Sequence, residues 1–366
     1  MAYPMEIAFG GPPRVVEQMT KGLPDHFDVT LVSFGHVDHI FFMNAIQDLK
    51  VINQRSLTRS VHRPVFGINK EVRKVLRQSD LILFHGVYFS YILLFSFFYG
   101  VKARKFMMPH GVFEPYQQKI RRYRKSLFDG ILNINKFWSN ITFIVATNSE
   151  VLGVRQKFPK SDISVVGLAV TVPLELIPKK PKQLCNLNGI KLVHVGRIVE
   201  KKRIDLTLNA VAELKKLGIN SEFIVVGKGD YKIEQQLKDL TKILNIEDQV
   251  TFRGQLYGKN LYKEYIEADI MVLPSENENF AISVGESILL KTPCVVSTEV
   301  ALSEIIIEYK TGVIIKSLAV TELVNAILQV YENYDYFSSN AFNVPDLFSI
   351  ESITENWVKT LNKDFE

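Results

Sequence analysis

Short runs of consecutive apolar residues recur along nearly the whole chain, and this pattern limits its fold more than any other feature. Examples are "DLILFHG" (80–86) and "ITFIVAT" (141–147), then "KLVHVG" (191–196) and "SEFIVVG" (221–227). The runs are rich in Val, Ile and Leu without polar alternation, which is typical of strands buried on both faces. Segments with helical periodicity lie between them. The sequence therefore predicts an α/β fold of parallel sheets covered by helices on both sides.

The alternation breaks once, at a Pro- and Lys-rich stretch over residues 173–191, and starts afresh after it. The 366 residues suffice for two domains. We expect two doubly wound domains with a cleft between them, residues 1–175 and 186–345. The final segment, 349–366, places Ile353, Trp357 and Leu361 on one helical face. We expect this last helix to pack back on the first domain.

Cysteine content and charge limit the environment and the partners. Two cysteines, Cys185 and Cys294, cannot build a disulfide framework, and the first residues do not resemble a secretory signal. We therefore expect a cytoplasmic protein. Residues 1–180 carry 24 Lys and Arg against 13 Asp and Glu, whereas residues 181–366 carry 20 against 26. This asymmetry favours an anionic partner for the first half, a membrane surface or a phosphate-bearing substrate, and no nucleic-acid recognition motif accompanies it.

Glycines and cations follow the predicted strands of the second domain. Gly196, Arg197 and Lys202 lie in the loop after "KLVHVG", and ligands of such sheets bind outside the carboxyl ends of the strands. The two cations suit a diphosphate, although a solvated basic loop explains them equally well. Gly227 and Arg253 end the next two strands. The glycine fits any tight turn, and backbone groups near the arginine are placed to meet a nucleotide base.

The stretch "SENENFAISVGES" (275–287) places three glutamates around a predicted helix start near residue 282. A helix N-terminus attracts phosphate through its free N–H groups and its dipole. Because carboxylates accept hydrogen bonds from sugar hydroxyls, Glu278 and Glu286 can hold two sugar rings with a diphosphate between them. The alternative is a solvated Glu278 and a Glu286 that only favours the helix dipole. Glu276 is expected in solvent.

Four motifs, taken in order, resemble one enzyme family. "ENFAISVGE" matches the E-x7-E pattern of retaining glycosyltransferases with the GT-B fold, glycosyltransferase family 4 in particular. "GRIVEKKRID" resembles that family's G-R-x4-K loop, "PHGVFEP" its P-H-G segment, and the Gly10–Gly11 pair its N-terminal glycine loop. The resemblance spans roughly residues 5–345. It implies two Rossmann-like domains facing a central cleft, the first binding the acceptor and the second the nucleotide sugar.

The resemblance also implies roles for the matched positions. Glu286 would bind the ribose hydroxyls of the donor, and Glu278 the hydroxyls of the transferred sugar. Arg197 and Lys202 would neutralise the departing diphosphate, a task in which preorganised cations contribute strongly to catalysis. The further donor-binding positions are Gly10, Gly11, Gly196, Gly227, Arg253, Asn279, Phe280 and Ala281.

His110, in the P-H-G segment, would lie beside the reacting sugar as a positioning and charge-stabilising group. Without the family context, a loop-end histidine bonded to backbone explains it better. His85 ends another predicted strand and is the weaker candidate. The chain also departs from the family: Asn279 stands where a glycine is frequent and adds a side chain facing the sugar. The prolines of "GGPPR" remove N–H groups from the glycine loop.

Neither a metal nor another cofactor is expected. No D-x-D triplet occurs in the sequence, and no Cys/His cluster offers a zinc site. Arg197 and Lys202 can supply the positive charge that a divalent ion would otherwise bring to the diphosphate.

Residues 117–138 combine apolar side chains with a basic block formed by Lys119, Arg121, Arg122, Arg124 and Lys125. Such a segment can lie on anionic lipid headgroups or form a solvated helix face. The apolar run 87–101 has about 15 residues, whereas a spanning helix needs about 20. Peripheral contact with the inner face of the cytoplasmic membrane is therefore one open hypothesis.

The family resemblance, together with the absence of a D-x-D triplet, implies a retaining, metal-independent glycosyltransferase. The donor would be a UDP- or GDP-sugar, the acceptor a hydroxyl of a glycan or lipid-linked glycan. By analogy, the setting would be bacterial surface polysaccharide biosynthesis (capsule, O-antigen or exopolysaccharide). Two alternatives stay open, a sugar-nucleotide epimerase of the same fold and a non-catalytic sugar-nucleotide-binding protein. A nicotinamide-dependent oxidoreductase is disfavoured, because no G-x-G-x-x-G follows the first strand.

Overall fold

The computed structural model describes residues 11–34, 50–54, 68–89, 91–93, 102–134, 137–181, 183–184, 189–344 and 348–363. The chain divides into two compact units, which are treated separately below. Unit 1 comprises Met1–Ala169 and Phe348–Glu366, and unit 2 comprises Val170–Leu347. The predicted first strand with Gly10 lies outside the described residues, as does much of the apolar run 87–101.

The described strands of unit 1 all pair in parallel. A four-stranded sheet has the order β3-β4-β5-β6, and a separate pair is formed by β1 and β2. The bounds are β1 (Thr30–Phe34), β2 (Lys50–Gln54), β3 (Leu81–His85), β4 (Arg104–Met108), β5 (Ile141–Val145) and β6 (Ile163–Val165). Strands β3 and β5 lie within the predicted runs 80–86 and 141–147, whereas β2 was not predicted. Parallel pairing places the ends of β3 and β4, and hence His85 and the segment after Met108, at the same edge of the sheet.

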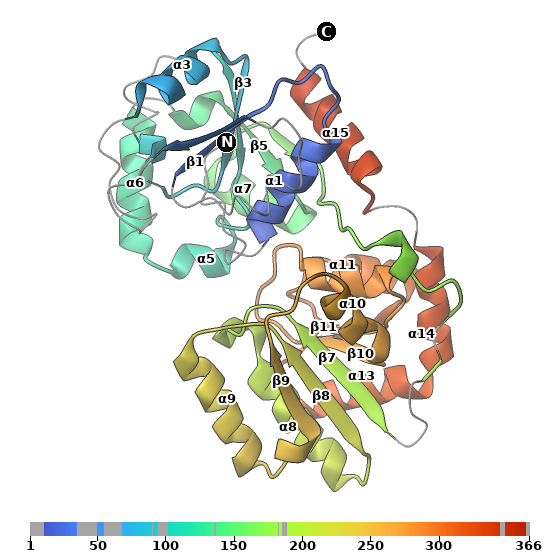
Figure 1. Ribbon diagram of the computed structural model, residues 1–366. Coiled ribbons are helices and arrows are strands. Elements are labelled where there is room, and N and C mark those ends of the chain that lie inside the picture. The colour runs from blue at the N-terminus through green and yellow to red at the C-terminus, as the bar shows by residue number, and fades with distance from the viewer. Residues whose placement is uncertain are drawn as a thin grey trace. The chain divides into compact units, whose positions relative to one another are not determined.

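In the core of unit 1, Phe113, Trp138, Phe143 and Phe158 contact one another. The helices of this unit are α1 (Gly11–Gly22), α3 (Lys70–Gln78), α5 (Pro115–Lys119), α6 (Arg122–Ile134), α7 (Asn148–Lys157) and α15 (Ile350–Asn362), with the 3-10 turn η2 (Phe137–Asn140). The last helix, α15, packs against α1 (Figure 1). It buries the predicted stripe of Ile353, Trp357 and Leu361.

Unit 2 contains one six-stranded parallel sheet with the order β12-β11-β10-β7-β8-β9. The bounds are β7 (Ile190–Val195), β8 (Ser221–Val226), β9 (Val250–Gly254), β10 (Ile270–Leu273), β11 (Cys294–Ser297) and β12 (Gly312–Ile315). This is the order of a doubly wound nucleotide-binding fold, in which the chain reverses direction across the sheet between the first and fourth strands. Here those strands are β7 and β10, so ligands are expected where their carboxyl ends meet.

The helices of unit 2 are α8 (Ile204–Lys216), α9 (Tyr231–Ile243), α10 (Gly258–Glu267), α11 (Ile282–Leu289), α12 (Ser303–Tyr309), α13 (Val320–Glu332) and α14 (Tyr334–Asn340). Short 3-10 turns are η3 (Leu174–Leu176), η4 (Glu200–Lys202), η5 (Glu247–Gln249) and η6 (Ala341–Asn343). Helices α8 and α13 contact each other and bury their apolar faces in one cluster with the sheet (Figure 1). Among the described residues, no helix has the length and apolar character needed to cross a bilayer.

Candidate functional site

The loops after β7 and β10 are joined by hydrogen bonds at the switch point of the unit 2 sheet. The Lys201 carbonyl, in η4 after β7, accepts from Glu276 N at 2.8 Å and from Ser275 Oγ at 2.9 Å. The Lys201 ammonium in turn donates to the Asn277 carbonyl at 2.8 Å. Both loops are therefore held in a fixed relation at the edge where this fold binds ligands.

Glu278 lies at the centre of this junction. Its Oε1 contacts Lys202 Nζ at 2.8 Å and Lys201 Nζ at 3.4 Å, and accepts a hydrogen bond from Ser275 Oγ at 3.0 Å. Its Oε2 lies outside these three contacts. The structure thus brings Glu278 and Lys202 together, 76 residues apart in the chain, and adds Lys201 as a second cation.

Burial and ion pairing oppose each other at Glu278 and Lys202. Burial alone would raise the pKa of Glu278, but the ammonium groups of Lys202 and Lys201 outweigh it and lower that pKa. Burial lowers the pKa of Lys202, and its contact with Glu278 only partly offsets this. The pair resides in a site of low dielectric, where a fixed charge acts strongly on a bound ligand.

Glu286 is buried in the second turn of α11, where Tyr265 of α10 donates a hydrogen bond to its Oε2 at 2.8 Å. Ala281 precedes this helix with a left-handed backbone (φ 62°). That conformation costs a non-glycine residue about 1 kcal/mol and turns the chain sharply into the helix. The N-terminal N–H groups of α11 therefore lie beside the loop that carries Glu278.

Two glycines after β8 allow its loop to approach the loop after β7. A Cβ at Gly227 would lie 1.8 Å from the Gly196 carbonyl oxygen, and one at Gly229 would lie 2.0 Å from the Ile198 carbonyl oxygen. A side chain at either position would displace the backbone that leads into Arg197. Gly227 thus shapes the predicted site through close packing of backbone.

The remaining predicted positions of unit 2 surround this junction. Arg197 is exposed, Asn279 is partly buried, and Phe280 is buried. Arg253 is exposed at the end of β9 and pairs with Glu264 of α10 at 3.3 Å. In the sheet order, β9 is separated from β10 by β7 and β8, so Arg253 lies toward the far edge.

The second unit and the fold as a whole are similar to known proteins. Residues 178–343 match the family model described as glycosyl transferases group 1. An uncharacterized glycosyltransferase of Haemophilus influenzae is 23% identical over 359 residues, covering 95% of each chain. The solved structure of HepE from Anabaena with UDP-glucose superposes with a TM-score of 0.76 at 16% identity, covering 99% of this chain and 98% of that one.

A second solved structure, WaaG, described as a glycosyltransferase involved in lipopolysaccharide biosynthesis, gives a TM-score of 0.71 at 15% identity over 99% of this chain and 98% of that one. The chain is a glycosyltransferase with the GT-B fold, and its second unit carries the group 1 domain.

In unit 1 of the glycosyltransferase, His110 follows β4 and pairs with His85 at the end of β3. His85 Nδ1 and His110 Nε2 are 3.0 Å apart, and the Tyr91 hydroxyl donates to the His85 carbonyl at 3.0 Å. Burial lowers the pKa of His110 to about 3, and burial together with His110 lowers that of His85. The two imidazoles are therefore neutral near pH 7 and share one hydrogen bond.

Glu150 fixes the segment that carries His110. Its buried carboxylate, in the first turn of α7, accepts hydrogen bonds from Gly111 N at 2.5 Å and from Ala146 N at 2.9 Å. His110 has a left-handed backbone (φ 54°), which needs such support. Gly11, the other predicted position of unit 1 that the structure describes, opens α1.

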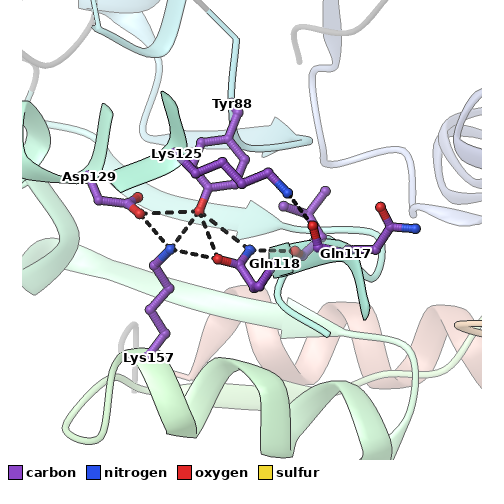
Figure 2. Close-up of polar contacts among 7 residues, drawn as sticks. Tyr88, Gln117, Gln118, Lys125, Asp129 and Lys157 are labelled. Carbon is purple, nitrogen blue, oxygen red and sulfur yellow. Dashed lines mark hydrogen bonds and ion pairs between the residues drawn. The ribbon is translucent and has the colours of Figure 1, made fainter. Parts of the chain in front are cut away.

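The basic segment of the glycosyltransferase divides into an inward and an outward part. Figure 2 shows Lys125 turned toward the body of unit 1, where its ammonium donates to the Gln117 carbonyl at 2.5 Å and lies 5.2 Å from the centre of the Tyr88 ring. Lys157 of α7 pairs with Asp129 of α6 at 2.5 Å and donates to the Tyr88 hydroxyl at 2.6 Å. This network ties α6 to α7, so Lys125 does not belong to the exposed basic block.

Glu276 is a loop residue with a partly exposed side chain, and its Oε1 also pairs with Arg203 Nη1 at 3.3 Å. Arg203 has a left-handed backbone (φ 51°) and also pairs with Asp205 at 3.0 Å. This ion pair is a further link between the loops after β7 and β10.

Sequence reasoning missed four contact residues, Lys201, Ser275, Tyr265 and Glu150. Lys201 lies in the stretch that resembles the G-R-x4-K loop, and Ser275 shortly precedes the E-x7-E motif. Both could have been proposed as polar neighbours of these motifs. Tyr265 and Glu150 carried no such signal, because only tertiary packing brings them to Glu286 and Gly111. Within the described residues no group of three or more His, Cys, Asp or Glu gathers as metal ligands would.

Proposed function

We propose that the chain is a retaining, metal-independent glycosyltransferase that transfers a sugar from a UDP- or GDP-sugar to a hydroxyl of a glycan or lipid-linked glycan. The observation that carries the proposal is the buried contact between Lys202 and Glu278 at the switch point of the unit 2 sheet. The cation can bind the anionic diphosphate of a nucleotide sugar, and the carboxylate can accept hydrogen bonds from the hydroxyls of its neutral sugar ring.

Each side chain of the site has a place in donor binding. Before the donor binds, Glu278 holds Lys202 on Oε1, and its Oε2 is the oxygen assigned to hydroxyls of the transferred sugar. Glu286 takes the ribose hydroxyls, with Tyr265 fixing the rotamer of its carboxylate. The N–H groups of Asn279, Phe280 and Ala281, just before α11, are assigned to the diphosphate and the sugar.

In the transfer step, a bond forms between the acceptor oxygen and the anomeric carbon while the bond from that carbon to the phosphate oxygen breaks. The departing diphosphate takes the proton of the acceptor hydroxyl, so that attack and departure occur on the same face and the configuration is retained. Arg197 and Lys202 stabilise the charge that develops on the leaving group. His110 positions the reacting sugar from unit 1.

Surface polysaccharide assembly in bacteria is the proposed setting. It is supported by the likeness to WaaG, whose description places that protein in lipopolysaccharide biosynthesis. The basic balance of residues 1–180 also suits an acceptor that carries phosphate or is attached to an anionic lipid.

The direct test is a transfer assay with UDP- and GDP-sugars and a lipid-linked glycan acceptor, followed by proton NMR of the product. We expect the anomeric configuration of the donor to be kept and the rate to be unchanged by excess EDTA. An inverted product, or activity that EDTA abolishes and Mg²⁺ or Mn²⁺ restores, would contradict the mechanism. Epimerised donor formed without acceptor would indicate the epimerase instead.

We further propose that α6 and the turn before it bind an anionic bilayer. Tyr123, Leu127 and Ile134 are 91%, 69% and 78% exposed, and their spacing places them on one face of α6. Exposed basic side chains accompany this apolar face at Lys119, Arg121, Arg122 and Arg124. The combination of exposed apolar and basic side chains matches the interior and the headgroups of a membrane surface.

Vesicle sedimentation tests this docking. The variant Arg121→Glu/Arg122→Glu/Arg124→Glu should lose at least tenfold in binding to vesicles containing phosphatidylglycerol, because each basic residue near the surface contributes about 1 kcal/mol. A control with the same net charge, Lys215→Glu/Lys216→Glu/Lys242→Glu in unit 2, should bind as the wild type does. Equal losses in both variants would mean that binding depends only on the net charge of the protein, and this would overturn the proposal.

A further inference from the structure

His194 is a buried, polar residue of the central strand β7 to which the proposed function gives no role. Its side chain is fully buried, and its Nδ1 lies 3.3 Å from the Val272 carbonyl oxygen on the neighbouring strand β10. A carbonyl oxygen only accepts, so Nδ1 carries the hydrogen and donates. The other ring nitrogen, Nε2, is therefore the unprotonated acceptor, and it is buried without a hydrogen-bond partner among the described residues.

This unpartnered acceptor lies near the ammonium of Lys202. A Cβ built on Gly196 would lie 3.6 Å from His194 Nε2 and 3.5 Å from Lys202 Nζ, so both atoms border the same small space under the loop. Burial and, to a smaller extent, the Lys202 ammonium lower the pKa of His194 to about 3. The imidazole is thus a neutral acceptor next to a buried cation that offers three N–H donors.

We propose that His194 is a positioning residue for Lys202: its Nε2 accepts a hydrogen bond from the Lys202 ammonium when that ammonium turns from Glu278 toward the donor diphosphate. The inference rests on the proposed function, which assigns the diphosphate to Lys202. A neutral acceptor orients the ammonium and leaves its positive charge intact. The Glu278 carboxylate orients the ammonium but also neutralises its charge. The full positive charge of Lys202 is then directed at the leaving group.

The charged groups around Lys202 give this role a measurable signature in the pH profile. Glu278 stabilises the ammonium, while burial and the nearby cations Lys201 and Arg197 destabilise it. Removing the acceptor at residue 194 removes one further stabilising contact. The alkaline fall in kcat/KM, which follows loss of the Lys202 proton, should therefore move to lower pH.

Two conservative variants separate positioning from a purely structural role. His194→Gln can place an amide oxygen near the position of Nε2, whereas His194→Asn can keep a donor near Nδ1 for Val272 but has nothing at Nε2. We expect His194→Gln to stay within about threefold of wild-type kcat. His194→Asn should lose at least tenfold in kcat with little change in donor KM, and its alkaline limb should shift downward. The opposite order, or equal rates without a shifted limb, would overturn the inference.

A measurement on the wild-type protein does not depend on how the variants fold. In protein labelled with ¹⁵N-histidine, the Nε2 resonance of His194, assigned by its absence in His194→Gln, should move upfield when saturating UDP or GDP is added. An unchanged resonance in protein that binds the nucleotide would refute the role of His194 and leave the proposed function standing. Failure of both nucleotides to raise the melting temperature would instead count against the donor site itself.

Discussion

At the scale of single residues, the glycosyltransferase keeps several ionisable groups in environments that favour one protonation state. Lys202 and Glu278 are charged and paired, whereas His85, His110 and His194 are buried and neutral. The paired groups lie where the donor diphosphate is proposed to bind. The neutral histidines lie beside strand ends, and burial is the main cause that lowers the pKa of each ring.

The neutral His194 predicts a specific pH dependence of stability. Below about pH 6.5 the unfolded chain takes up a proton at this residue, whereas the folded chain does not until about pH 3. Stability from His194 is therefore complete above pH 6.5 and falls by about 1.4 kcal/mol for each pH unit below it. Urea unfolding of wild type and His194→Gln should show their difference in unfolding free energy changing by about that amount between pH 5.5 and 4.5. A difference that is constant with pH would contradict a neutral, buried His194.

At the scale of elements, the site is made by loops at strand ends and by the helices that begin there. Lys201 joins the loop after β7 to the loop after β10, and Gly227 lets the loop after β8 pack against them. The position of Arg197, in the loop after β7, therefore depends on the absence of a side chain at Gly227, in the loop after β8. This close backbone packing can be tested without touching any polar group of the site.

Gly227→Ala should destabilise the protein by at least 2 kcal/mol, because the added Cβ clashes with the Gly196 carbonyl and the backbone is left-handed (φ 145°). Gly218→Ala is the matched control, since its φ is also positive (76°) but nothing lies within 4 Å of the added Cβ. This control should cost only about 1 kcal/mol of backbone strain. Equal shifts in melting temperature for the two variants would mean that the close approach at Gly227 contributes nothing.

The sequence predicted the elements that depend on local pattern and missed those that depend on distant partners. Buried strands such as β7 and β8 are mostly apolar, despite Lys191 and His194 in β7 and Glu222 in β8, so they could be recognised directly. The short β2 begins at Lys50 and ends at Gln54, and its pairing with β1 is what makes it a strand. Likewise, spacing selected Glu278 and Glu286, but no pattern could link Glu286 to Tyr265 or place His194 beside Lys202.

At the scale of the whole molecule, the chain passes between its two units twice, near residues 169–170 and 347–348. The return segment ends in α15, which is fixed to unit 1 by packing against α1 and by a hydrogen bond from Arg104 to the Leu361 carbonyl at 2.8 Å. All of the proposed donor contacts lie in unit 2, except the glycine loop and His110, which belong to unit 1. Donor binding should be measurable as stabilisation that depends on residues of unit 2.

The most direct test of the account is the stabilisation of the protein by UDP- and GDP-sugars, measured as a shift in melting temperature. A ligand at one hundred times its Kd adds about 2.7 kcal/mol to the native state. We predict that at least one nucleotide sugar stabilises the wild type and that Glu286→Ala, which removes the ribose partner, abolishes most of this shift. The control Glu304→Ala, an exposed glutamate of α12, should retain it. If no nucleotide sugar stabilises the wild type, or if Glu286→Ala keeps the full shift, the donor site is not where the account places it.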